Sequence, residues 1–86
     1  MIYDELIKGI SPDKIFVNED MSKHTSFKVG GIADFFIKVD DMQELLYVLK
    51  LAKKLRIKTY VVGNGTNLII KDTGFRGIII KLNFYV

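Results

Sequence analysis

The sequence contains no cysteine and only one proline among its 86 residues. Without cysteine there is no disulfide, no thiolate metal site and no thiol nucleophile. No stretch approaches the ~18 consecutive apolar residues of a membrane-spanning helix, and the N-terminus lacks the basic flank of a signal peptide. Because 49% of the residues are apolar and 27% are charged, we expect one small globular domain with a cytoplasmic location.

Charge is distributed unevenly along the chain. Residues 1–44 carry nine acidic and five basic side chains, a net charge of −4, whereas residues 45–86 carry one acidic and eight basic, a net charge of +7. The positive half favours an anionic ligand through its overall field. Four of its cations fall on an expected helix or at its end, and we interpret them as exposed to solvent: Lys50, Lys53, Lys54 and Lys58.

The apolar pattern predicts an α/β fold. The expected elements are a helix over 2–10, strands over 15–17 and 33–39, a helix after Asp41, strands over 59–62 and 77–82, and a short extended piece over 69–71. Asp41 and Glu44 predict an N-terminal cap for the second helix. Its apolar residues recur at helical spacing: Met42, Leu45, Leu46, Leu49, Ala52 and Leu55. The order strand, helix, strand predicts a small, mainly parallel sheet with flanking helices.

The most informative segment is a loop between two short apolar runs, Val61–Val62 and Leu68–Ile70. Its two glycines supply positive φ and let a ligand approach the backbone, while its Thr and Asn add side-chain donors. Successive backbone N–H groups turned toward one point bind anions, phosphates above all. We therefore predict a phosphate-binding loop that consists of Gly63, Asn64, Gly65, Thr66, Asn67 and Leu68.

Two better-known phosphate motifs do not match this loop. The dinucleotide fingerprint G-x-G-x-x-G needs a third glycine and a helix at the place where this chain has Leu68 and a β-branched run. The P-loop needs a Gly-Lys-Ser/Thr that is absent here. The triplet G-N-G is also common in tight turns, and that interpretation stays open on the loop alone.

Two further motifs accompany the loop in a fixed order. Residues 24–34 read HTSFKVGGIAD, then come the expected helix and the loop, and residues 72–77 have the pattern D-x-G-x-x-G. From His24 to about Leu82, this order resembles the UDP-N-acetylenolpyruvoylglucosamine reductase (UDP-N-acetylmuramate dehydrogenase) family. That family consists of flavoproteins with a vanillyl-alcohol-oxidase-type (VAO/PCMH-type) FAD-binding domain. The chain departs from the sequence pattern of this family at two positions: Thr66, where the family more often has serine, and Ile32, where it frequently has proline.

The resemblance implies that residues 1–86 are the N-terminal part of an FAD-binding domain. Residues 1–22 would be an N-terminal helix and connector, and residues 23–82 the first lobe, in which loop 63–68 holds the FAD diphosphate. Gly30 and Gly31 would shape the loop before the first strand of the lobe. The second FAD lobe and the substrate domain would be absent.

The resemblance also implies an activity for the full-length protein. NADPH reduces the flavin, which then reduces UDP-N-acetylglucosamine enolpyruvate to UDP-N-acetylmuramate in peptidoglycan synthesis. The family's catalytic residues lie farther downstream, so we assign no catalytic residue here and expect the 86-residue chain alone to be inactive. No metal, nucleic acid or membrane partner is expected.

Two other classes of function stay open on the sequence alone. One is a stand-alone nucleotide- or anion-binding module without redox activity, and the other is an interaction domain. The chain ends in an aromatic and apolar segment after the unbroken run Ile78–Ile80. Unbroken apolar strands are usually covered on both faces. In a complete FAD-binding domain the second lobe would cover this strand, and that lobe would be absent here. We therefore expect the C-terminal strand to lie exposed in this chain and to favour self-association.

Overall fold

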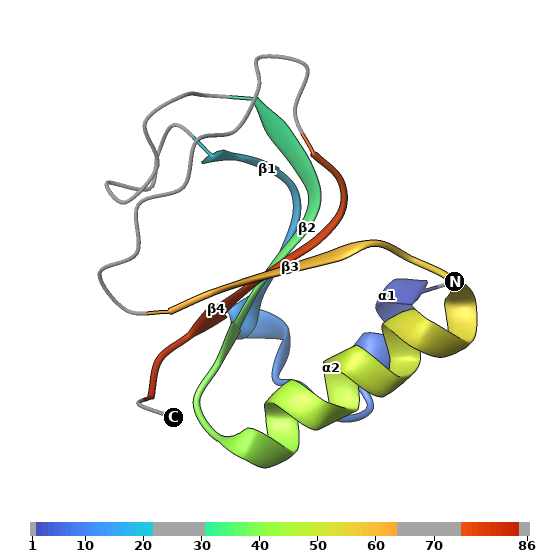
Figure 1. Cartoon of the computed structure of the whole chain (residues 1–86), viewed down its shortest axis with the longest axis vertical. Coiled ribbons are helices and arrows are strands. Elements are labelled where there is room, and N and C mark those ends of the chain that lie inside the picture. Colours follow the sequence, from blue (N-terminus) through green and yellow to red (C-terminus); the bar gives the residue numbers. More distant parts are fainter. Residues whose placement is uncertain (1, 22–30, 64–74, 85–86) are drawn as a thin grey trace.

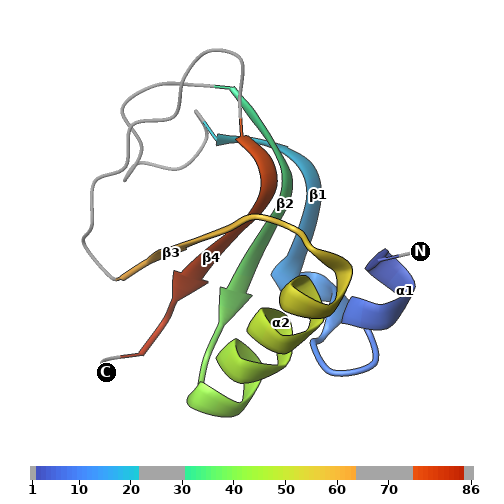
Figure 2. The same ribbon diagram turned by 45° about the vertical axis from the view of Figure 1, so that its right-hand side comes forward.

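A four-stranded sheet with helices on one side forms the fold (Figures 1 and 2). The computed structural model describes residues 2–21, 31–63 and 75–84. Its elements are α1 (Ile2–Leu6), the 3-10 turn η1 (Pro12–Lys14), β1 (Ile15–Asp20), β2 (Ile32–Val39), α2 (Met42–Leu55), β3 (Thr59–Val62) and β4 (Phe75–Leu82). The strand order is β1-β2-β4-β3; β1 is antiparallel to β2, and the other two pairings are parallel. The predicted fold class is therefore confirmed.

The helices cover one face of the sheet. Ile37 of β2 and Ile80 of β4 are fully buried and belong to the same core cluster as Val48 of α2. Leu6, the last residue of α1, is fully buried in this cluster too. Burying a side chain of this size stabilises the fold by about 1.5–3 kcal/mol relative to leaving it in water. This face is the main core of the described residues.

The start of α2 has the predicted cap. Asp41 Oδ1 accepts a hydrogen bond of 2.8 Å from the backbone N–H of Glu44. Glu44 Oε1 in turn accepts one of 2.7 Å from the N–H of Asp40, one residue before the position that a standard capping box uses. At its other end the helix stops at Arg56, whose φ of 58° is left-handed.

The face of α2 that packs on the sheet differs from part of the predicted stripe. Its buried residues are Leu45, Val48 and Ala52, whereas Leu46 and Leu55 are 46% and 42% exposed. Apolar residues occupy more than one side of this helix, and only the direction of the sheet decides which side is buried. The four lysines interpreted as solvated are all exposed.

The first helix is shorter than predicted. It ends at Leu6, and the chain turns before Ser11. A Cβ on Gly9 would lie 2.7 Å from the Tyr47 ring of α2, so any larger residue at Gly9 would require this ring to shift. The Tyr47 hydroxyl also donates a 2.5 Å hydrogen bond to the carbonyl oxygen of Glu5. Tyr47 thus packs against the turn that follows α1 and contacts the helix itself.

The expectation of an exposed C-terminal strand is wrong. β4 lies between β2 and β3, so both of its edges are paired. Ile78, Ile79 and Ile80 are each 0% exposed, and Phe84 packs against the main core. The crossover from β2 through α2 to β3 leaves a gap in the sheet that β4 fills. Self-association through this strand therefore has no basis in the structure.

A β-bulge interrupts the pairing of β4 with β2. Ala33 is opposite Phe75 and Phe35 is opposite Ile78, so β4 has one residue more than β2 between these pairs. Gly77 lies in this bulge with a φ of 150°, a region in which side chains are rarely found. The last glycine of the D-x-G-x-x-G pattern thus has a structural role inside strand β4.

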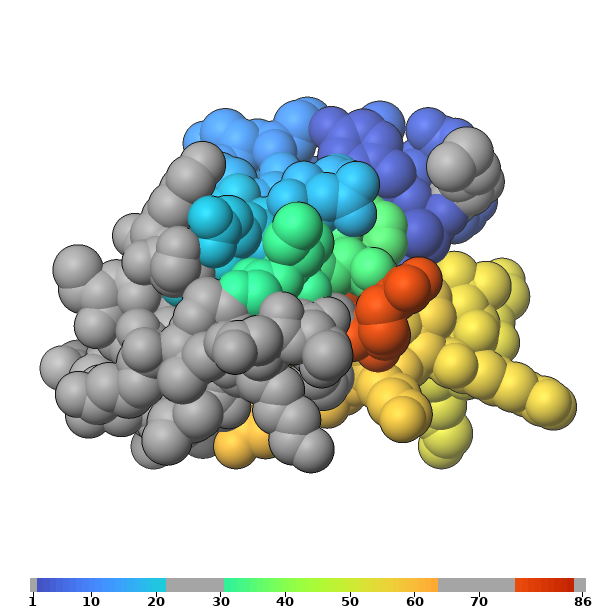
Figure 3. All heavy atoms as spheres, turned by 90° about the horizontal axis from the view of Figure 1, so that it is seen from above, coloured from blue at the N-terminus to red at the C-terminus, as the bar shows by residue number. Residues whose placement is uncertain are grey.

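The sheet face opposite the helices carries a second, smaller cluster. Phe36 of β2 pairs with Phe16 on one side and Ile79 on the other, and Ile79 also pairs with Tyr60 of β3. Phe36 and Ile79 are fully buried, and Tyr60 is 48% exposed. Seen from above, β1, β2, β4 and β3 succeed one another across the molecule in this order (Figure 3).

Candidate functional site

The three parallel strands end at one edge of the sheet. Val39 at the end of β2 pairs with Leu82 of β4, and Val62 at the end of β3 pairs with Lys81. Gly63 therefore leaves the sheet close to the ends of β2 and β4. In open α/β sheets, ligands bind outside the carboxyl ends of the strands. This carboxyl edge is the candidate site.

Of the predicted phosphate loop, the structure describes Gly63 alone. Gly63 is partly exposed and directly follows Val62, which is 3% exposed. The other five loop residues, Asn64 to Leu68, lie outside the described part of the chain, so their role stays a prediction. The same applies to Gly30 and to the expected extended piece over 69–71.

Gly31 lies at the opposite end of β2 from this edge. Its φ is 119°, which favours glycine, and its carbonyl oxygen accepts a 2.9 Å hydrogen bond from the N–H of Met21. The prediction that Gly31 shapes the entry to the strand is confirmed. Because β2 and β3 run in the same direction, Gly31 before β2 and Gly63 after β3 are not brought together.

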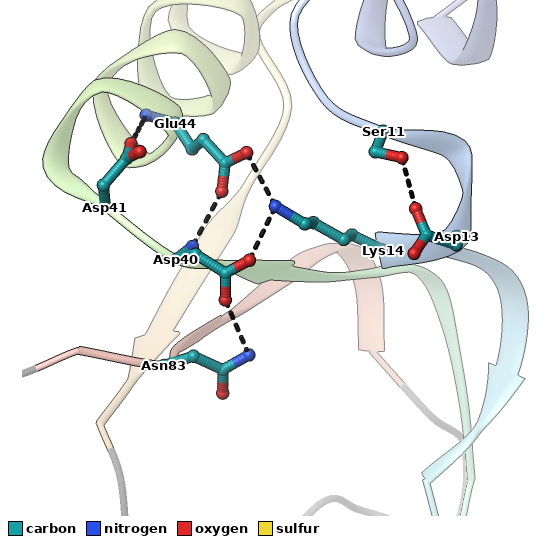
Figure 4. Close-up of polar contacts among 7 residues, drawn as sticks. All are labelled: Ser11, Asp13, Lys14, Asp40, Asp41, Glu44 and Asn83. Atoms are coloured by element: carbon teal, nitrogen blue, oxygen red, sulfur yellow. Dashed lines mark hydrogen bonds and ion pairs between the residues drawn. The ribbon is translucent and has the colours of Figure 1, made fainter.

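A network of ion pairs and hydrogen bonds joins the N-terminal segment to the carboxyl edge (Figure 4). Lys14 Nζ is 2.6 Å from Asp40 Oδ2 and 2.9 Å from Glu44 Oε2. Asn83, just after β4, donates a 3.3 Å hydrogen bond from Nδ2 to Asp40 Oδ1, and its backbone N–H donates one of 2.8 Å to the Val39 carbonyl. The ends of β2 and β4 and the start of α2 are thus tied together.

The network changes the acidity of its members. Hydrogen bonds from Lys14 and then from Asn83 hold the pKa of Asp40 below its usual value. The Asp40 and Glu44 carboxylates raise the pKa of Lys14 above its usual range. Both groups are therefore charged at neutral pH.

Two lysines lie next to each other near the carboxyl edge, on the face without helices. Lys38 of β2 and Lys81 of β4 are paired in the parallel register, two residues after Phe36 and Ile79. Lys38 Nζ lies 5.4 Å from the centre of the Phe16 ring. Lys81 also pairs with Val62, the residue before Gly63. Both lysines are partly exposed, and neither forms an ion pair with a carboxylate of the described residues.

Sequence reasoning missed this lysine pair. Each lysine comes after an apolar run, Phe35–Ile37 in one strand and Ile78–Ile80 in the other. That shared pattern was the available signal, but only the strand order and register show that the two positions are neighbours.

Other features of the described residues give no competing site. A shallow hollow of about 310 Å³ lies on the helix side, lined by Ile2, Glu5, Leu51, Lys54 and Leu55. Residues 2–21, 31–63 and 75–84 contain no cluster of three or more His, Cys, Asp or Glu side chains that would hold a metal ion. Within the same ranges, no helix has the length and apolarity needed to cross a lipid bilayer.

The geometry defines a class: a small α/β lobe whose glycine-containing loop leaves the carboxyl edge of its parallel strands. Comparison with known proteins narrows this class. The chain is similar to proteins named UDP-N-acetylenolpyruvoylglucosamine reductase. It is 44% identical to the one from Clostridioides difficile over 94% of this chain and 40% identical to the one from Alkaliphilus oremlandii over 93%. The Clostridium kluyveri protein is 46% identical over 81% of the chain. The resemblance predicted from the motifs is confirmed.

The similarity covers only part of each relative. The chain spans 27% of the length of the C. difficile protein, 26% of the A. oremlandii protein and 23% of the C. kluyveri protein. No family model matches the chain. The similarity thus establishes a relationship to about a quarter of such a reductase.

Proposed function

We propose that this chain is the first FAD-binding lobe of an NADPH-dependent UDP-N-acetylenolpyruvoylglucosamine reductase. The complete enzyme would reduce UDP-N-acetylglucosamine enolpyruvate to UDP-N-acetylmuramate for peptidoglycan synthesis, in the cytoplasm. Residues 63–68 would hold the FAD diphosphate. The other half of the cofactor site, the substrate site and the catalytic residues would come from outside these 86 residues.

The similarity to the named reductases over nearly the whole chain is the observation that carries this proposal. The fold supports it, because the predicted loop starts at Gly63 on the carboxyl edge of a parallel sheet, where phosphate groups are commonly bound.

The residues at this edge fit a diphosphate. A glycine at the strand end lets phosphate oxygens approach the backbone N–H groups of the loop. Lys81, beside Val62, adds positive charge to the same edge. Bound FAD would supply hydride transfer between NADPH and the enolpyruvyl group. This chain's own contribution would be to bind and orient the diphosphate.

The test is flavin binding by the complete gene product and by its Gly65→Val variant. A β-branched residue at this position would block the backbone conformation and the approach of the ligand. We expect a loss of about 2–4 kcal/mol, the equivalent of one or two charge-assisted hydrogen bonds. The matched control is Thr66→Ser, which keeps the hydroxyl and should bind FAD as the unaltered protein does.

Flavin absorbance and equilibrium titration with FAD measure the outcome. Unaltered FAD affinity in Gly65→Val would show that the loop does not hold the cofactor. A colourless protein that binds phosphate ligands but no flavin would instead favour a nucleotide-binding module without redox activity.

A further inference from the structure

The lysine pair Lys38/Lys81 places two like charges side by side on neighbouring strands. Like charges opposite each other on neighbouring strands are destabilising. The register makes the two residues direct partners on the face without helices. In contrast, Lys14 and Arg76 each form an ion pair with a carboxylate.

Two carboxylates near Lys38 in the sequence, Asp40 and Asp34, have other partners. Asp40, two residues after Lys38, binds Lys14 and Asn83. Asp34, earlier in β2, lies 3.2 Å from Arg76 Nε. Among the residues that the structure describes, the charges of Lys38 and Lys81 are therefore not compensated by an ion pair.

The position of the pair points to an anionic ligand. Paired residues of adjacent strands are separated by about 4.8 Å, a spacing that lets one lysine reach each phosphate of a diphosphate. Lys81 lies beside the residue that precedes Gly63. The contact of Lys38 with the Phe16 ring gives its side chain a defined place on the surface.

We propose that Lys38 and Lys81 form a subsite that binds a diphosphate group at the carboxyl edge of the sheet, next to the start of the 63–68 loop. The inference rests on the proposed function and adds to it two binding residues outside the loop. The diphosphate belongs either to FAD or to the UDP part of the sugar substrate, because both present the same chemistry.

Titrations of the complete gene product with FAD and, separately, with UDP distinguish the two sources. The variants are Lys38→Gln, Lys81→Gln and the double substitution. Lys53→Gln is the matched control, because Lys53 is exposed on α2 on the helix side of the sheet and its loss changes the net charge equally. Lys81→Arg keeps the charge and tests rescue. Circular dichroism checks that each variant is folded.

We expect each neutral substitution to weaken one of the two ligands roughly ten- to hundredfold, the loss expected for a hydrogen bond to a charged group. The double variant should lose more and should respond less to added salt, because fewer charges remain to be screened. Lys81→Arg should retain most of the affinity. A loss for FAD alone assigns the pair to the cofactor, and a loss for UDP alone assigns it to the substrate.

Two results would overturn the inference, and they can be told apart. If both ligands bind the double variant as tightly as they bind Lys53→Gln, the lysine pair is not a subsite and the proposed function stands. If the unaltered protein binds neither FAD nor UDP, the proposed function fails and the inference fails with it.

Discussion

The two faces of the sheet are built from the same strands but differ in the residues that lie beyond the buried row. On the helix side, Ile37 and Ile80 are succeeded by Val39 and Leu82, and all four residues belong to one core. On the other side, Phe36 and Ile79 are succeeded by the lysine pair. On the helix side, apolar packing continues to the carboxyl edge. On the other side, the last pair of residues that β2 and β4 place before this edge is positively charged.

If the lysine pair binds a ligand as proposed, this difference separates stability from binding. An apolar residue at the edge lowers the free energy of the fold by leaving water. Two neighbouring cations have no such effect, and their repulsion opposes folding slightly. Substitutions of the buried apolar residues near the edge on the helix side should therefore lower stability, whereas substitutions of the lysine pair on the other side should lower ligand affinity.

The largest expected effect is on the helix side. Ile80→Ala removes a fully buried side chain and leaves a cavity, so we expect a loss of about 2–5 kcal/mol of unfolding free energy. Lys81→Gln, one residue later on the opposite face, should leave that free energy nearly unchanged. Urea unfolding of both variants makes the comparison. Equal losses in the two would mean that the faces do not differ in the way described.

The second effect concerns the bulge that aligns β4 with β2. Gly77→Val places a β-branched residue at a φ of 150°, which should cost roughly 1–3 kcal/mol. Ile32→Val, at a 53% exposed position in β2, is the control and should change stability by less than about 0.5 kcal/mol. Thermal and urea unfolding measure both. A Gly77→Val variant as stable as the control would show that the strand adapts without strain.

The smallest effect is expected at the ion-pair network. Lys14→Met removes the partner of Asp40 and Glu44, so we expect a small decrease in melting temperature near neutral pH. The control is Lys8→Met, which removes an exposed pair with Glu5 and should change the melting temperature less. If the Lys14→Met variant has the same melting temperature as the unaltered protein at neutral pH, the network does not stabilise the edge.

The pH dependence of the stability difference between Lys14→Met and the unaltered protein can be derived from the pKa shifts of Asp40 and Lys14. Folding lowers the pKa of Asp40, so its contribution is present above the unfolded value of about 4 and is lost as pH falls through the folded value. Folding raises the pKa of Lys14, so its contribution is present below about pH 10.4 and is lost as pH rises through the folded value. The difference between Lys14→Met and the unaltered protein should thus be constant between these limits and shrink in acid. A difference that grows below pH 4 would contradict this.

Local chemistry in the sequence predicted much of the fold. The strand Thr59–Val62 has the predicted bounds, and the cap at Asp41 marks the start of α2 as expected. Both depend on short-range rules. The contact of Gly9 with the Tyr47 ring, in contrast, depends on how α2 packs against the N-terminal segment. The buried side of α2 depends on the direction of the sheet, and the place of β4 depends on the strand order. These are tertiary facts that a linear pattern does not contain.

The candidate site was only partly predictable for the same reason. A glycine-rich loop after a strand is visible in the sequence, and Gly63 indeed leaves β3 at the carboxyl edge. Lys38 and Lys81 are 43 positions apart in the sequence, and they become neighbours only through the parallel register of β2 with β4. Their link to the loop therefore needed the structure.

The most direct test of FAD binding at the carboxyl edge is a titration of the ¹⁵N-labelled complete gene product with FAD, monitored by NMR. We expect the backbone amide signals of Gly63 and of its neighbours in the 63–68 loop to shift as FAD binds. Signals from Ala52 and Lys53 on the helix side should stay in place. FAD-dependent shifts confined to the helix side, or saturating FAD binding with no change at Gly63, would contradict the assignment of the carboxyl edge as the cofactor site.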